Sequence, residues 1–206
     1  MVQVLLLKER LAMSLILAMS AFALVMSVTP GPVNIVTLTS GANYGVARTL
    51  PFVSGATVGF TALLLVLGLG AAQLLESAPD LMRLIGALGA AFILYMAFKL
   101  VTADGALSES NGKRPGFTDG VLMQWLNPKA WIACVSGIAA FTTQNDFSSL
   151  ALFCTLYFFI CYAGVGVWAV IGRQAQFLIR SETRLKGFNR VMGAALAGVG
   201  VYLLVL

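Results

Sequence analysis

The sequence has 206 residues, of which 59% are hydrophobic and only 10% are charged. With a mean hydropathy of +0.92, it has too few polar side chains to cover a soluble globule. The net charge of +5 does not indicate nucleic-acid binding, because the lysines and arginines are scattered rather than gathered in a basic stripe with interleaved aromatic residues. The composition therefore predicts an integral protein of the lipid bilayer with no nucleic-acid partner.

Six stretches are apolar enough to be membrane spans, since crossing the hydrocarbon core takes about 20 apolar residues. In chain order they are residues 13–44, 50–74, 81–99, 117–141, 150–172 and 188–206. The first is too long for one straight crossing, so we expect two helical pieces that are joined at its prolines. The prediction is an all-α, multi-pass membrane protein with six transmembrane helices.

Prolines interrupt the first and the fourth of these stretches. The first contains Thr29-Pro30-Gly31-Pro32, and the fourth contains Asn127-Pro128-Lys129-Ala130. A helix broken by proline leaves backbone groups without partners, and lipid cannot supply them, so such breaks are tolerated where they line a cavity. Interrupted spans at corresponding positions of two halves indicate a transporter's substrate site. The alternative is a pair of packing kinks.

A polar, turn-rich linker at residues 102–116 divides the chain into two halves of nearly equal length, residues 13–101 and 117–206. Each half contains three predicted spans, and the first span of each is broken at proline. Because three is odd, the second half must enter the membrane from the opposite side. We therefore expect two inverted three-helix repeats.

The cations predict the orientation of the protein. If the spans alternate from an outside N-terminus, one side receives Arg48, Lys99, Lys113, Arg114, Arg173, Arg180, Arg184, Lys186 and Arg190. The positive-inside rule then places the linker and the segment 173–189 in the cytoplasm. That segment alternates apolar and basic residues, so we expect it on the inner membrane surface, with protein binding as the alternative.

The N-terminus carries two further signals. Lys8 and Arg10 precede the first span and favour the opposite orientation, a conflict that disappears if Met13 is the natural start. The basic residues, the apolar run and Ala21-Phe22-Ala23 together resemble a cleavable secretory signal. Because the apolar run continues to Val28 and leads into the proline break, we expect it to be retained.

The broken spans carry the candidate binding residues. Asn127 is a good N-cap and proline is favoured at the first helical position, so the half-helices should begin at Pro128 and, after Pro30 and Gly31, at Pro32. Two helix N-termini then converge near the midplane, where their N–H groups suit a substrate carboxylate. Lys129 adds a full positive charge, with a snorkelling lysine as the alternative.

Three polar side chains lie near the same breaks. Asn34, Thr37 and Asn127 could select an ammonium group or a polar side chain, and Asn34 and Thr37 share one helical face. For Thr37, Thr39 and Ser40 the alternative is a hydrogen bond to their own helix backbone.

Small and sulfur-containing residues are expected to pack. The glycine pairs Gly41 and Gly45, Gly55 and Gly59, and Gly116 and Gly120 have the spacing of close helix contacts, with a homodimer face as the alternative. Cys134, Cys154 and Cys161 read as apolar packing residues. Histidine is absent and no acidic cluster lies in a span, so we expect no metal site, no cofactor and no enzymatic triad.

At its proline motifs the chain resembles the LysE/RhtB family of bacterial amino-acid exporters. The resemblance rests on Thr29-Pro30-Gly31-Pro32, Gly41, Gly45, the stretch from Gly55 to Gly59, Ile93-Leu94-Tyr95-Met96-Ala97, and Phe117, Gly120, Leu126, Asn127, Pro128, Lys129 and Ala130. It implies an inner-membrane exporter that uses proton motive force to expel amino acids or close derivatives. Many relatives carry Asn and a basic, Gly-rich turn where this chain has Val33-Asn34 and a lone Arg48, a departure that bears on substrate identity.

The wider superfamily supplies other functions. Thiol electron carriers would need a cysteine in each broken span, and here the second has Cys134 whereas the first has none. Metal exporters would need acidic or histidine ligands in the spans. A non-transporting scaffold is a third alternative. For the exporter, Asp119 and Lys129 are the candidate proton carriers, and the two halves would rock to give alternating access.

Overall fold

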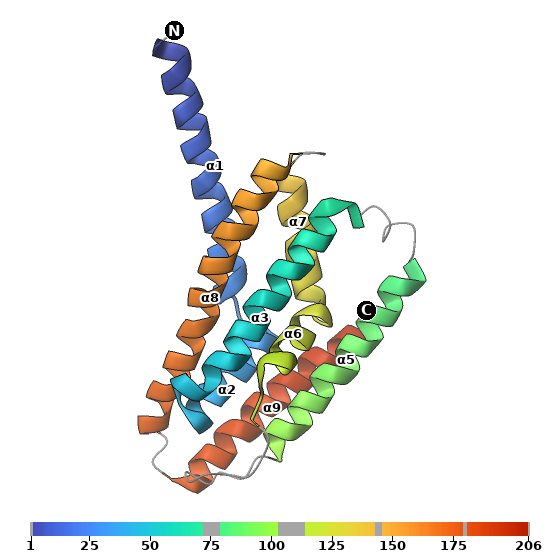
Figure 1. Cartoon of the computed structure of the whole chain (residues 1–206). Coiled ribbons are helices and arrows are strands. Elements are labelled where there is room, and N and C mark those ends of the chain that lie inside the picture. The colour runs from blue at the N-terminus through green and yellow to red at the C-terminus, as the bar shows by residue number, and fades with distance from the viewer. Residues whose placement is uncertain (1, 72–78, 103–113, 143–145, 179–180, 206) are drawn as a thin grey trace.

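The computed structural model describes residues 2–71, 79–102, 114–142, 146–178 and 181–205, and these residues form helices without any strand (Figure 1). The elements are α1 (Val2–Val28), α2 (Pro32–Tyr44), α3 (Val46–Val66), the π-helical turn η1 (Leu67–Ala71), α5 (Pro79–Val101), α6 (Phe117–Trp125), α7 (Pro128–Phe141), α8 (Phe147–Leu178) and α9 (Glu182–Val205). The all-α prediction is confirmed for the described residues.

Two described helices are long and apolar enough to cross a membrane, namely Val46–Gly70 and Phe147–Ala175. A third span is present if Ala12–Val28 and Pro32–Tyr44 count as one bent crossing. Ala87–Val101 and Pro128–Phe141 are apolar but shorter. The structure therefore supports an integral membrane protein, while the count of six spans stays a prediction.

Both breaks fall where the prolines predict them. The axes of α1 and α2 differ by 61°, and α2 begins at Pro32 after a fully extended Gly31 with φ −169°. In the second half, α6 ends at Trp125 and α7 begins at Pro128, with Asn127 in an extended conformation. Each half-helix thus has proline at its first position, where the missing N–H group costs nothing.

The chain reverses direction between helices except at the two breaks, where α2 continues α1 and α7 continues α6, as the colour gradient of Figure 1 shows. The C-terminal ends of α2, α5 and α8 gather at one end of the bundle with the N-terminal ends of α3, α6 and α9. The first pieces of the broken spans pack on the other half, α1 against α8 and α6 against α3, and α5 packs against α9. The division into repeats 13–101 and 117–206 stays a prediction.

Glycines allow the two halves to approach closely. A Cβ atom on Gly55 would overlap the carbonyl oxygen of Phe117, and one on Gly120 would overlap that of Phe52. Between α2 and α8, a Cβ on Gly41 would overlap the Ala169 carbonyl oxygen. The predicted close helix packing is confirmed at these positions, and it lies within one chain. The homodimer alternative is untested.

We expect Gly55→Ala to destabilise the protein by at least about 1–3 kcal/mol, because the α3–α6 contact leaves no room for a methyl group. Gly166→Ala is the matched control, since a Cβ there meets no atom within 4 Å. In the middle of α8 that change should be neutral or stabilising by about 0.5–1 kcal/mol. Thermal unfolding in detergent compares the two, and equal melting temperatures would contradict the packing account.

Two boundaries differ from the sequence prediction. α1 already begins at Val2, although its apolar span starts at Ala12, because a helix does not end where hydropathy falls. The polar segment 173–189, which the sequence suggests is a loop, is helical over most of its described length. α8 continues to Leu178, α9 begins at Glu182, and Leu185 and Asn189 are buried. Basic and apolar residues alternate there because two helix ends each present one face to solvent. Most of the linker, residues 103–113, lies outside the described residues.

Candidate functional site

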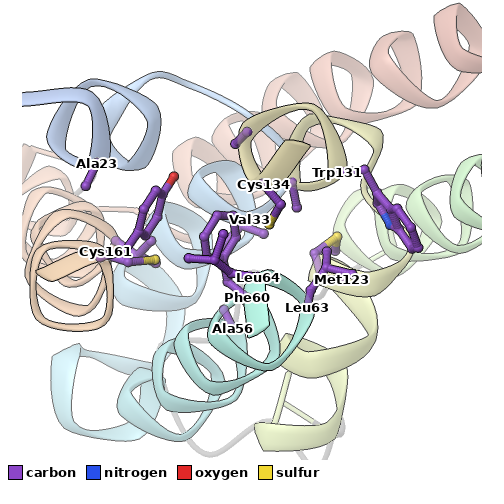
Figure 2. Close-up of a cluster of buried hydrophobic side chains, with 14 of the residues drawn as sticks. Ala23, Val33, Ala56, Phe60, Leu63, Leu64, Met123, Trp131, Cys134 and Cys161 are labelled. Atoms are coloured by element: carbon purple, nitrogen blue, oxygen red, sulfur yellow. The ribbon is translucent and has the colours of Figure 1, made fainter. Parts of the chain in front are cut away.

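A small cavity lies between the two breaks. It is lined by Met26, Ser27, Val33, Asn34, Phe60, Gln124, Asn127, Lys129, Ala130, Ala133, Tyr157, Cys161 and Val165. Its volume is about 30 Å³, which is room for about two water molecules. Val33, Phe60 and Cys161 also belong to the hydrophobic cluster drawn in Figure 2. The cavity is therefore too small for an amino acid, which could be accommodated only if the helices moved.

Lys129 reaches from the second break to the first. The Asn127 side chain accepts a hydrogen bond from the Lys129 backbone N–H at 3.1 Å, which fixes the start of α7. From there the Lys129 Nζ donates to the Thr29 carbonyl oxygen at 2.6 Å. A Cβ on Gly31 would lie only 3.2 Å from Lys129 Cδ, so glycine leaves room for this crossing. A single cation thereby joins both broken spans.

Three carbonyl groups beside the breaks accept hydrogen bonds from side chains. Besides the bond from Lys129 to Thr29, the Asn34 Nδ2 donates to the Ser27 carbonyl oxygen at 2.8 Å. At the second break, the Trp131 Nε1 donates to the Trp125 carbonyl oxygen at 2.7 Å. These bonds give partners to the carbonyl groups of Ser27, Thr29 and Trp125 beside the breaks, where the helical bonding is interrupted and lipid offers no donor.

The two half-helix N-termini differ in what they offer a ligand. At α7 the first N–H groups already have acceptors. The Asn127 side chain accepts from the Lys129 N–H, and the Asn127 carbonyl oxygen accepts from the N–H groups of Ala130 and Trp131. At α2 no side chain caps the helix, and Pro32 has no N–H group. The N–H groups of Val33 and Asn34 therefore have no acceptor one turn earlier within α2. Of the two half-helices, α2 is therefore the one whose first N–H groups lack a partner within the helix, and its start lies beside the Lys129 ammonium.

The structure brings together some of the predicted site residues. Asn34, Asn127 and Lys129 line the cavity, and all three come from the breaks. Pro30, Gly31, Pro32 and Pro128 shape the breaks without lining it.

Thr37 and Asp119 do not line the cavity. The Thr37 hydroxyl donates to the Val33 carbonyl oxygen at 2.8 Å and the Thr39 hydroxyl to that of Ile35 at 2.9 Å, which is the backbone alternative considered from the sequence. One Asp119 carboxylate oxygen accepts from the Gly116 N–H at 2.7 Å and so holds the start of α6.

Four lining residues with a polar or sulfur-containing side chain were not among the predicted site residues: Ser27, Gln124, Tyr157 and Cys161. Gln124 and Tyr157 are polar residues inside apolar spans, a signal that could have singled them out. The Tyr157 ring stacks on Phe60 with centroids 4.2 Å apart. Ser27 lies in the last turn before the first break, a place where a polar side chain can reach the unwound backbone. Cys161 was expected only to pack, and it is indeed buried.

A second cavity lies toward the end of the bundle where α2, α5 and α8 end. We call this the basic end, because Lys99, Arg173 and Lys186 lie there. Its volume is about 50 Å³, and it is lined by Val36, Thr39, Ser40, Asn43, Tyr44, Met96, Lys99, Leu100 and Pro115. Just beside it, the side-chain amides of Asn43 and Asn189 exchange two hydrogen bonds of 2.8 and 3.0 Å. α2 thus contributes its first turn to the first cavity and its later turns to the second.

A cavity between two broken apolar spans, with a cation beside a helix N-terminus, is typical of a secondary transporter. Comparison with known proteins agrees. The chain belongs to the LysE type translocator family, whose model matches residues 24–206.

Several relatives are named as efflux proteins. The cysteine/O-acetylserine efflux protein of Klebsiella pneumoniae subsp. pneumoniae is 28% identical over 128 residues, which cover 62% of this chain and 65% of the relative. That match spans just under two thirds of the relative's length. The cysteine/O-acetylserine efflux protein of Escherichia coli strain K12 is 25% identical over 176 residues, covering 83% of this chain and 89% of the relative. No solved structure matches significantly.

Proposed function

We propose that this protein is a secondary-active exporter of the bacterial inner membrane, which expels amino acids or close derivatives using proton motive force. The observation that supports this function best is the Lys129 ammonium, which lies beside the uncapped N-terminus of α2 at a small cavity between the breaks. A cation and free N–H groups at membrane depth suit a carboxylate. Family membership and the efflux proteins among the relatives point the same way.

In this proposal the Lys129 ammonium leaves the Thr29 carbonyl oxygen and pairs with the substrate carboxylate instead. The N–H groups of Val33 and Asn34 then complete the anion site at the start of α2. The substrate ammonium needs an acceptor, and the side-chain oxygen of Asn34 is placed for it, because the Asn34 Nδ2 already donates to Ser27. The bond from Lys129 to Thr29 therefore acts as an internal substitute for the substrate.

The relatives' names suggest small substrates without a net side-chain charge. Among the described residues, those that line the cavity include one cation, Lys129, and no carboxylate. A cationic substrate side chain would meet the like charge of Lys129 without a compensating acid. We therefore take L-cysteine, L-serine and O-acetylserine as test substrates.

Transport would follow from rocking of residues 13–101 against residues 117–206. The bond between Lys129 and Thr29 joins these halves, so breaking it would favour opening. We propose the second cavity, which α2 and α5 line toward the basic end, as the route from the cytoplasm. For proton coupling, Lys129 is the better placed of the two candidates, since Asp119 is engaged with the Gly116 N–H.

Everted membrane vesicles from cells that express the chain test this function. Uptake of radiolabelled L-serine and L-cysteine should exceed that of vector vesicles and should collapse when an uncoupler is added. Uptake that is unaffected by the uncoupler would contradict proton coupling. Absence of uptake for every amino acid of a broad panel would contradict export itself and favour the scaffold, metal or electron-carrier alternatives.

The orientation can be tested with engineered cysteines. We expect Arg184→Cys at the start of α9 to react with an impermeant maleimide only after the cells are permeabilised, since the basic end should be cytoplasmic. Ser148→Cys at the start of α8 should react in intact cells. The three native cysteines are buried and give a low background. The reverse pattern of labelling would overturn the proposed orientation.

A further inference from the structure

Two hydroxyl groups near the cavity are buried without a hydrogen-bond partner among the described residues. They are the Ser27 Oγ on α1 and the Thr57 Oγ1 on α3, and their side chains belong to residues that are 5% and 0% exposed. Helix-borne threonines elsewhere in the chain, such as Thr61, donate to the carbonyl oxygen one turn earlier. An unpaired buried hydroxyl is unfavourable, so native structures rarely keep one without a reason.

Both hydroxyl groups lie beside one thiol, that of Cys161 on α8. Ser27 and Cys161 line the cavity, whereas Thr57 approaches Cys161 without lining it. Tyr157 lies one turn before Cys161 on the same helix and also lines the cavity. Ser27, Tyr157 and Cys161 thus line the same cavity as Lys129, and Thr57 lies behind Cys161.

We propose that Ser27 and Cys161 form a subsite that binds the hydroxyl or thiol group of the substrate's side chain, with Thr57 positioning the Cys161 thiol. This inference rests on the proposed function, because it takes the substrate's carboxylate to be held at Lys129. A serine hydroxyl both donates and accepts, so it can pair with another hydroxyl or with a thiol in either direction. The stacked rings of Phe60 and Tyr157 limit the subsite to short side chains.

Such a subsite should discriminate strongly in one direction. A site built from buried polar groups rejects a ligand that lacks the matching group, since its own groups are then left unpaired. An apolar pocket of the same shape would barely distinguish a ligand that carries the polar group from one that lacks it. L-Serine should therefore bind better than L-alanine, and L-cysteine better than L-2-aminobutyrate. The two members of each pair differ mainly in the polar atom of the side chain.

Thermal-shift titrations of the purified full-length protein in detergent measure these four ligands. We expect the wild type to bind L-serine at least about tenfold more tightly than L-alanine. Ser27→Ala and Thr57→Val should each reduce that ratio to about threefold or less, and Thr57→Val should not lower the melting temperature, because it removes an unpaired hydroxyl while keeping the side chain's shape. Thr61→Val, which removes a hydroxyl bonded within its own helix, should leave the ratio unchanged.

The outcomes separate this inference from the proposed function. If the wild type binds L-serine and L-alanine equally, or if Ser27→Ala and Thr57→Val both keep the full preference, the subsite is overturned while amino-acid binding stands. If no amino acid shifts the melting temperature and vesicles take up none, the proposed function fails as well. A ratio that falls in both variants but not in Thr61→Val supports the subsite, because a merely structural role would weaken both ligands alike.

Discussion

Lys129→Met should reduce amino-acid export by more than about 30-fold while the protein still folds and reaches the membrane. The change removes the ammonium and keeps much of the side chain's volume. Loss of one partner of a buried charge pair costs about 2–5 kcal/mol, which corresponds to a factor of about 30 or more. Uptake by everted vesicles, normalised to the amount of protein in the membrane, measures the effect.

Two further variants sharpen this result. Lys129→Arg should also be impaired, because the broad guanidinium fork must pass Gly31, where the lysine stem already packs tightly. Lys186→Met on α9 removes a cation away from the cavity and should leave export near the wild-type level. Normal export by a well-expressed Lys129→Met would remove the support for a counter-charge at this position.

The second large effect is expected for Pro32→Ala. Alanine supplies the missing N–H group and removes the clash of the Pro32 ring, so that only Pro30 still opposes a continuous helix through Gly31. The N–H groups at the start of α2 would then bond to α1 carbonyl oxygens, and binding of L-serine should fall at least about tenfold. If the continuous helix forms, the protein itself should be no less stable, since a proline at a position that has become interior to a helix would cost about 3 kcal/mol.

A simple packing kink would behave in the opposite way. Straightening it would disturb the contacts of α2 with α8, lower the melting temperature and leave the affinity of the folded fraction unchanged. Pro51→Ala in α3 is the matched control, because that proline is exposed inside a helix and does not line the cavity. Unchanged affinity in a folded Pro32→Ala protein would rule out a binding role for the first break.

The breaks could be predicted from the sequence because their cause is local. Proline has no N–H group and a fixed ring wherever it occurs, so Pro32 and Pro128 mark helix starts without knowledge of the fold. Asn127 as a cap follows from the same local chemistry, and the structure confirms it. For Lys129 the sequence predicts only a position near the breaks. Its hydrogen bond to Thr29 could not be predicted, because it depends on how two distant spans pack.

The opposite wall of the cavity could not be predicted from the sequence. Tyr157 and Cys161 lie on α8 within a long apolar run, and only packing against α1 and α3 decides which of its residues face the cavity. Thr37 shows the converse case. It shares a helical face with Asn34, but its hydroxyl donates to the Val33 carbonyl oxygen one turn earlier, so that proton is not available to a ligand. Segment 173–189 looked like a loop because helix ends that reach solvent also carry charge.

The most direct test of the central claim compares L-serine with L-serinamide, which lacks the carboxylate, for the wild type and Lys129→Met. The account predicts that the wild type binds L-serine at least about tenfold more tightly than the amide, since a charged hydrogen-bond partner contributes about 1.5–3 kcal/mol. In Lys129→Met the preference should shrink to about threefold or less, the remainder coming from the N–H groups of α2. A full preference for the carboxylate in folded Lys129→Met would contradict the claim that Lys129 holds it.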